Sequence, residues 1–125
     1  MLKLLIVEDQ KMQLEAMVES LETQGYTILQ ASTGEEAISV IQEQKPELIL
    51  LDLYLEDMTG LRVLIKAKEF NPKCCVIILT GFDVDTTKEK AFSLGADYFL
   101  IKPIPLAVLK QCLSEAAKTI TEKDR

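Results

Sequence analysis

Short apolar runs alternate with segments of helical periodicity along the whole 125-residue chain. In the first such pair, an apolar run at 4–7 precedes Leu14, Met17, Val18 and Leu21, which recur at the spacing of one helix face. The apolar runs lie at 4–7, 27–31, 48–51, 76–79 and 99–101. Three of them lack alternation, which is typical of strands covered on both faces of a parallel sheet. We therefore predict an α/β fold, a single doubly wound sheet of five parallel strands with five helices.

The helices have recognisable ends and apolar faces. Thr33 followed by Glu36 has the spacing of a capping box, so the second helix is predicted to begin there and to end before Pro46. The apolar positions expected to face the sheet are Leu61, Leu64 and Ile65 in the third helix and Leu106, Leu109, Leu113, Ala116 and Ile120 in the fifth. Residues 1–121 are predicted to form one domain, and residues 122–125 a polar tail or the start of a linker.

The composition excludes several classes of function. The 20 acidic residues outnumber the 14 basic ones, giving a net charge of −6, which argues against direct nucleic-acid binding. The chain has no histidine, so catalytic triads and zinc sites that need one are excluded. The three cysteines lack a C-x-x-C spacing and are expected to be core residues of a reduced, cytoplasmic protein. The first apolar run ends at Glu8 and is too short for a signal peptide or a membrane span, so no membrane association is expected.

Chemistry-bearing side chains follow four of the apolar runs. Glu8 and Asp9 follow the first run, Asp52 the third, Thr80 the fourth and Lys102 the fifth. Doubly wound sheets bind ligands beyond the carboxyl ends of their strands, so these side chains are expected to meet. Carboxylates that lie so close repel one another unless a cation such as Mg²⁺ binds among them. An aspartate beside a lysine and a bound cation can act as a nucleophile toward phosphorus.

The same positions carry a resemblance to a known family. Val7-Glu8-Asp9, the stretch from Asp52 to Gly60, Thr80-Gly81, Gly95-Ala96-Asp97 and Lys102-Pro103 resemble the receiver domain of bacterial two-component response regulators. The resemblance covers essentially the whole chain in order, and it implies the flavodoxin-like receiver topology. It also implies a domain that accepts a phosphoryl group from a sensor histidine kinase or a histidine phosphotransfer protein and switches its surface for output. Such a domain is a phosphoacceptor rather than an enzyme, since it catalyses only its own phosphorylation and slow dephosphorylation.

The resemblance assigns the acidic residues to phosphorylation and to Mg²⁺ binding. It implies that Asp52 is the phosphorylated aspartate and also a metal ligand. Asp9 is implied as a direct ligand, Glu8 as a ligand acting largely through water, and the backbone carbonyl of Tyr54 as a further ligand.

Other residues are assigned to the response. The resemblance implies that Lys102 pairs with Asp52 and then with its phosphoryl group, and that Thr80 moves toward that group on activation. Phe99 takes the position of the aromatic switch, which is usually Tyr in the family. The Lys102–Pro103 peptide bond is expected to be cis, as in the family.

Departures from the family pattern lead to further expectations. Glu56 stands where Pro is common, which is expected to loosen the loop after Asp52, whereas Asp57 is expected to be only a turn residue. Tyr54 and Phe82 are expected to overhang the phosphoryl group, and neither offers an amide or a carboxylate to orient an attacking water. The phosphorylated form is therefore expected to be long-lived. The last helix lacks the arginines of regulators that dimerise through their last two helices, so this dimer is not expected.

Three alternatives remain to be weighed against this interpretation. A phosphatase of the haloacid dehalogenase type would need Asp-x-Asp after the first strand, and a flavodoxin-like binding module would need a Gly/Ser/Thr-rich phosphate loop there. The third is a receiver-shaped interaction module that is never phosphorylated. The sequence identifies neither the kinase and its signal nor the downstream target, which is either a separate protein or an output domain of a longer chain, and it leaves the oligomeric state open.

Overall fold

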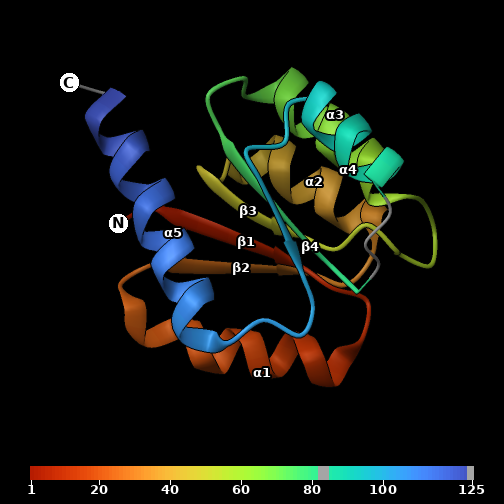
Figure 1. Cartoon of the computed structure of the whole chain (residues 1–125). Coiled ribbons are helices and arrows are strands. Elements are labelled where there is room, and N and C mark those ends of the chain that lie inside the picture. Colours follow the sequence, from red (N-terminus) through yellow and green to blue (C-terminus); the bar gives the residue numbers. More distant parts are fainter. Residues whose placement is uncertain (82–84, 124–125) are drawn as a thin grey trace.

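The computed structural model describes residues 1–81 and 85–123, whose strands form one parallel sheet (Figure 1). The strands are β1 (Lys3–Val7), β2 (Thr27–Ala31), β3 (Leu48–Leu51), β4 (Cys75–Thr80) and β5 (Tyr98–Ile101). Their order in the sheet is β2-β1-β3-β4-β5, so β1, β3 and β4 are each flanked by strands on both sides. Every pairing is parallel, and the predicted five-stranded sheet is confirmed.

Helices cover both faces of this sheet, which makes it doubly wound (Figure 1). The helices are α1 (Lys11–Leu21), α2 (Gly34–Gln44), α3 (Gly60–Phe70), α4 (Asp85–Ser93) and α5 (Leu106–Lys123), with a short 3₁₀ helix at Glu22–Gln24. One apolar cluster contains buried residues of α2, α3 and α4, and a second contains buried residues of α1 and α5. Alternate residues of the central strands enter the two clusters, so Leu5 joins the first and Leu4 the second. Strands β3 and β4 are consequently buried from end to end, and β1 is buried from its second residue onward.

The predicted beginning and end of α2 are confirmed. The Thr33 hydroxyl accepts a hydrogen bond from the Glu36 backbone N–H at 3.1 Å, which satisfies one of the free donors of the first turn. The helix ends at Gln44, and Lys45 takes a left-handed conformation with φ of 49° just before Pro46.

Two of the predicted apolar faces need correction. In α3, Ile65 is 39% exposed, and the buried stripe consists of Val63, Leu64 and Ala67. In α5, Leu106 is 42% exposed because it opens the helix one turn before Leu109, the first position that reaches the core. The helix also continues to Lys123, into the segment expected to be a tail.

The three cysteines are free and buried, as expected for core residues. Burial raises the pKa of the Cys74 thiol to about 11 and that of Cys75 to about 12. Both thiols are therefore protonated and unreactive near neutral pH. Over the residues that the structure describes, none of the helices has the length and apolar character needed to cross a membrane.

Candidate functional site

The carboxyl ends of β1, β3, β4 and β5 bring the predicted site residues together. Asp52 follows the central strand β3, and its backbone N–H donates to the carbonyl of Val7 at 3.2 Å, which sets Glu8 beside it. Glu8 is 1% exposed and Asp52 9% exposed, although both carry carboxylates. Buried carboxylates need partners, because transfer of a charge out of water is costly.

Lys102 supplies the positive charge that these carboxylates need. Its ammonium donates to Glu8 Oε1 at 2.7 Å and to Asp52 Oδ2 at 3.1 Å. Burial opposes the ammonium charge, but the hydrogen bonds and the attraction of Glu8 and Asp52 outweigh it and raise the pKa of Lys102. Lys102 is therefore a fixed cation that links strands β1, β3 and β5.

Gln13 is a site residue that the sequence reasoning missed. Its side-chain Oε1 accepts a third hydrogen bond from the Lys102 ammonium at 3.1 Å. With Asp9, Asp52 and Gly81 it lines an opening of about 270 Å³ above the site. Gln13 thus places a side-chain amide at this opening, in addition to the Tyr54 and Phe82 side chains that the sequence predicts near the acceptor.

Glu8, Asp9 and Asp52 form a group that could hold a metal ion. Each offers a carboxylate oxygen, and these oxygens lie within 4.8 Å of one another. Glu8 is engaged on both sides, since its Oε2 also accepts from the Gln10 backbone N–H at 3.1 Å. Both oxygens of Asp52 are engaged as well, by the Tyr54 backbone N–H at 2.9 Å and by the Lys102 ammonium at 3.1 Å, so a metal ion would share these oxygens with those donors. Carboxylates beside an opening that admits water are the donor set that Mg²⁺ prefers, so the residues present fit this ion.

Thr80 places a hydroxyl beneath the same edge, at the end of β4. Its Oγ1 is buried and has no hydrogen-bond partner within residues 1–81 and 85–123. A buried hydroxyl without a partner is unfavourable by about 1–3 kcal/mol. Thr80 is therefore a donor available to an acceptor oxygen that binds at this edge.

The strand beside Thr80 carries Phe99. The Phe99 side chain is half-buried, and its ring lies against Phe92 of α4 with the centroids 6.4 Å apart. The predicted cis peptide bond between Lys102 and Pro103 is confirmed. Phe82 lies outside the residues that the structure describes, so its placement over the site stays a prediction.

The loop between β3 and α3 differs from expectation at Asp57. Rather than being only a turn residue, Asp57 caps α2, because its two carboxylate oxygens accept from the backbone N–H groups of Gly34 at 2.8 Å and Glu35 at 2.9 Å. Nothing local in the sequence signals this contact between distant segments. A bridge between Tyr54 and Thr59 closes this loop, and the looseness expected from Glu56 stays a prediction.

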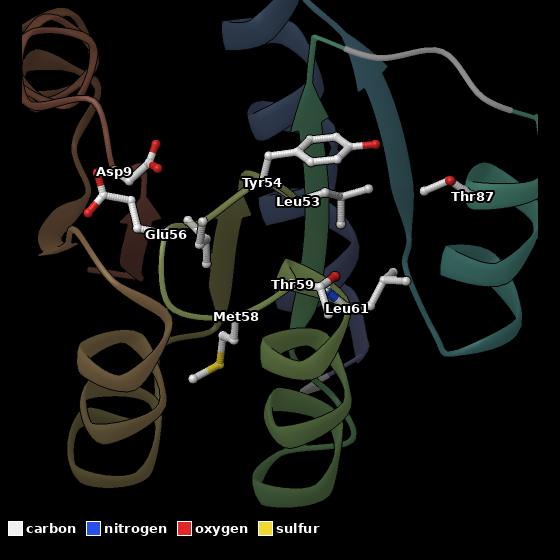
Figure 2. Close-up of a pocket in the computed structure, with 9 residues that line it drawn as sticks. Asp9, Leu53, Tyr54, Glu56, Met58, Thr59, Leu61 and Thr87 are labelled. Atoms are coloured by element: carbon white, nitrogen blue, oxygen red, sulfur yellow. Dashed lines mark hydrogen bonds between the residues drawn. The ribbon is translucent and has the colours of Figure 1, made fainter.

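A groove of about 420 Å³ adjoins the acidic group (Figure 2). Figure 2 shows Asp9 and Glu56 at one end of the groove and Thr87, which belongs to α4, at the other. Tyr54 lines it and is 47% exposed, which agrees with the expected position of this ring on a loop next to the acceptor.

Comparison with known proteins agrees with this geometry. The family model of the response regulator receiver domain matches residues 4–114, most of the chain. The chain belongs to this family.

Relatives of known name are longer than this chain. It is 33% identical to a cyclic di-GMP phosphodiesterase of Thermotoga maritima, over 91% of the chain and 30% of that protein. It is also 33% identical to the alkaline phosphatase synthesis transcriptional regulatory protein PhoP of Bacillus subtilis, over 81% of the chain and 42% of that protein. The chain thus spans less than half the length of these relatives.

Solved structures of similar length confirm the flavodoxin-like receiver fold. A CheY-like response regulator receiver domain protein of Methanospirillum hungatei superposes with a TM-score of 0.95 at 28% identity, covering 98% of both chains. The signal receiver domain of a putative Luxo repressor protein of Vibrio parahaemolyticus gives a TM-score of 0.93 at 32% identity, covering 98% of this chain and 95% of that one.

Proposed function

We infer that this receiver domain accepts a phosphoryl group on Asp52 in a Mg²⁺-dependent reaction and then changes its surface to signal. The observation that carries this proposal is the Asp52 carboxylate itself, which lies in hydrogen-bond contact with Lys102 and within 4.8 Å of the carboxylate oxygens of Glu8 and Asp9. The nucleophile, the fixed cation and the candidate metal ligands thus meet at one point.

In the proposed reaction, a carboxylate oxygen of Asp52 attacks the phosphorus of the donor. A new oxygen–phosphorus bond forms while the bond from phosphorus to the donor's leaving group breaks, and the leaving group keeps the electron pair. Lys102 offsets negative charge on the oxygens of the transferred phosphoryl group, and the Thr80 hydroxyl donates a hydrogen bond to one of them. Asp9, Asp52 and the Tyr54 carbonyl would hold Mg²⁺, with Glu8 acting largely through water, and the bound ion would supply the remaining charge neutralisation.

The proposed donor is a phosphohistidine on a sensor histidine kinase or on a histidine phosphotransfer protein in the cytoplasm. The output passes to a downstream protein or to an output domain of the same polypeptide. The acidic composition speaks against direct nucleic-acid binding by this domain. The proposed switch is a movement of Thr80 toward the phosphoryl group, which lets Phe99 turn into the vacated space and repacks the surface around β5.

Acetyl phosphate tests this function without a partner protein. With Mg²⁺, the intact mass is expected to increase by one phosphoryl group, and the Asp52→Asn variant is expected to gain none. Asp97→Asn, at the opposite edge of the sheet, is the control and should be labelled like the wild type. Undiminished labelling of Asp52→Asn would contradict the assignment.

A further inference from the structure

The loop between β3 and α3 (residues 53–59) carries one of the proposed metal ligands, the Tyr54 carbonyl. Its base is closed by contacts within the same segment. The Tyr54 N–H donates to Asp52 Oδ1 at 2.9 Å, and the Gly60 N–H donates to the Leu53 carbonyl at 2.8 Å. A Cβ added at Gly60 would lie 2.4 Å from the Asp52 carbonyl oxygen, so the first residue of α3 is in close contact with the backbone that follows β3.

The tip of this loop is held by a different element, the first turn of α2. Asp57 accepts the hydrogen bonds from Gly34 and Glu35, and these bonds lower the pKa of its carboxyl. Met58 packs against the same turn, since a Cβ added at Gly34 would lie 2.3 Å from Met58 Cγ. One polar and one apolar contact therefore fix the loop tip to a helix that begins 23 residues earlier in the chain.

We propose that Asp57 is a positioning residue for the metal site, because its bonds to α2 hold the 53–59 loop and with it Tyr54, which lines the same opening as Asp9 and Asp52. The inference rests on the Mg²⁺ site of the proposed function. Without this attachment, binding of Mg²⁺ has to order the loop as well, and the ordering cost weakens affinity. Asp57 is not itself among the acids that could share a metal, because its oxygens face α2.

A purely structural role would make Asp57 nothing more than a cap of α2. Thr33 allows the two roles to be separated, because it caps the same turn through Glu36 but precedes α2 instead of lying on the metal loop. Removal of either side chain deprives α2 of a cap. Only the removal of Asp57 also releases the loop.

The experiment is an NMR titration with Mg²⁺ that follows the backbone amide signals of Asp9 and Tyr54. Asp57→Ala is expected to raise the dissociation constant about tenfold, the size of effect typical of groups that orient metal ligands. Asp57→Asn keeps one acceptor oxygen and should give an intermediate value. Thr33→Ala controls for the lost cap and Glu35→Gln for the lost charge, and both are expected to stay within about twofold of the wild type.

The outcomes separate this inference from the function on which it rests. If wild type binds Mg²⁺ and Asp57→Ala binds it equally well, the positioning role is overturned while the metal site stands. An equal loss of affinity in Thr33→Ala or Glu35→Gln would overturn it too, because the loss would then come from the helix cap or the charge. If wild type binds no Mg²⁺, the metal site of the proposed function fails and the inference with it.

Discussion

A lysine–aspartate pair lies at each end of the parallel strands, and the two pairs have different further partners. We call the side of the sheet where the strands begin the amino edge and the side where they end the carboxyl edge. At the amino edge, Lys68 donates to Asp97 at 2.9 Å and to the Cys74 carbonyl, and Asp97 also accepts from the Val76 N–H at 2.8 Å. One positive and one negative charge are balanced there, with backbone groups as further partners. At the carboxyl edge, the single ammonium of Lys102 faces Glu8 and Asp52, with a third acid close by.

At the carboxyl edge, therefore, charges and hydrogen-bonding groups remain without sufficient partners, unlike at the amino edge. It carries an excess of negative charge, and the buried Thr80 hydroxyl there has no partner among the described residues. A cation and a phosphoryl oxygen would satisfy both. We infer that an ion pair at the end of a parallel sheet indicates function when its surroundings remain unsatisfied and indicates structure when they do not.

The largest expected effect is on the rate of phosphorylation, when each of the two lysines is replaced in turn by methionine. Lys102→Met should slow phosphorylation by acetyl phosphate about a hundredfold or more, because a fixed charge on the transferred oxygens is lost. Lys68→Met removes the same charge at the amino edge and should stay within about twofold of the wild-type rate. The rates are measured from intact mass over time. Equal slowing in the two variants would mean that the edges do not differ in function.

Binding of Mg²⁺ should stabilise the folded domain through the carboxyl edge and not through the amino edge. At Mg²⁺ concentrations of about ten to a hundred times the dissociation constant, the free energy of unfolding is expected to rise by about 1 to 3 kcal/mol. The gain should shrink in Asp9→Ala and persist in Asp97→Ala. Urea unfolding with and without Mg²⁺ measures it, and a wild-type protein without any gain would count against the metal site.

The ring of Tyr54 should limit the access of water to the carboxyl edge. It is expected to obstruct the water that hydrolyses the phosphorylated form, so Tyr54→Asn should speed dephosphorylation by about three- to tenfold, or up to about 1.4 kcal/mol of barrier. Tyr54→Phe keeps the bulk of the ring and serves as the control, with an unchanged rate. A timed loss of phosphate in the presence of Mg²⁺ measures the rates. If Tyr54→Asn decays no faster than wild type, the lifetime is set by other groups.

The smallest change in stability is expected at Thr80. Thr80→Ala removes a buried hydroxyl that has no described partner but also a buried methyl group. Because these two effects oppose each other, the free energy of unfolding should change by less than about 1 kcal/mol. The variant should still accept phosphate, but the NMR shifts that phosphorylation causes at residues 85–112 should be much reduced. Thr80→Ser retains the hydroxyl and should respond like the wild type. Shifts of equal size in Thr80→Ala and wild type would refute the proposed coupling.

The carboxyl edge could be predicted from the sequence because its residues directly follow buried strands. An apolar run fixes where a strand ends, and parallel strands bring their ends to one edge, so Asp52 and Lys102 could be paired although they are 50 residues apart. The confirmed sheet followed from the same apolar runs, whereas the confirmed cis peptide bond was implied by the resemblance to the receiver family. A residue at a strand end is placed by topology alone.

Residues on helices and loops were harder to place, since their contacts depend on packing. Gln13 reaches Lys102 across 89 residues, and Asp57 reaches the start of α2 across 23. No local pattern signals either contact. Periodicity gave α3 an apolar stripe but not its direction, and so Ile65 was placed on the buried face in error.

The most direct test of the central claim is to locate the phosphoryl group chemically. After reaction with acetyl phosphate, borohydride reduces an aspartyl phosphate to homoserine, which can be assigned by sequencing the peptides in a mass spectrometer. We expect homoserine at position 52 alone, with Asp9 and Asp97 unmodified. Homoserine at Asp9 or Asp97, with Asp52 intact, would contradict it.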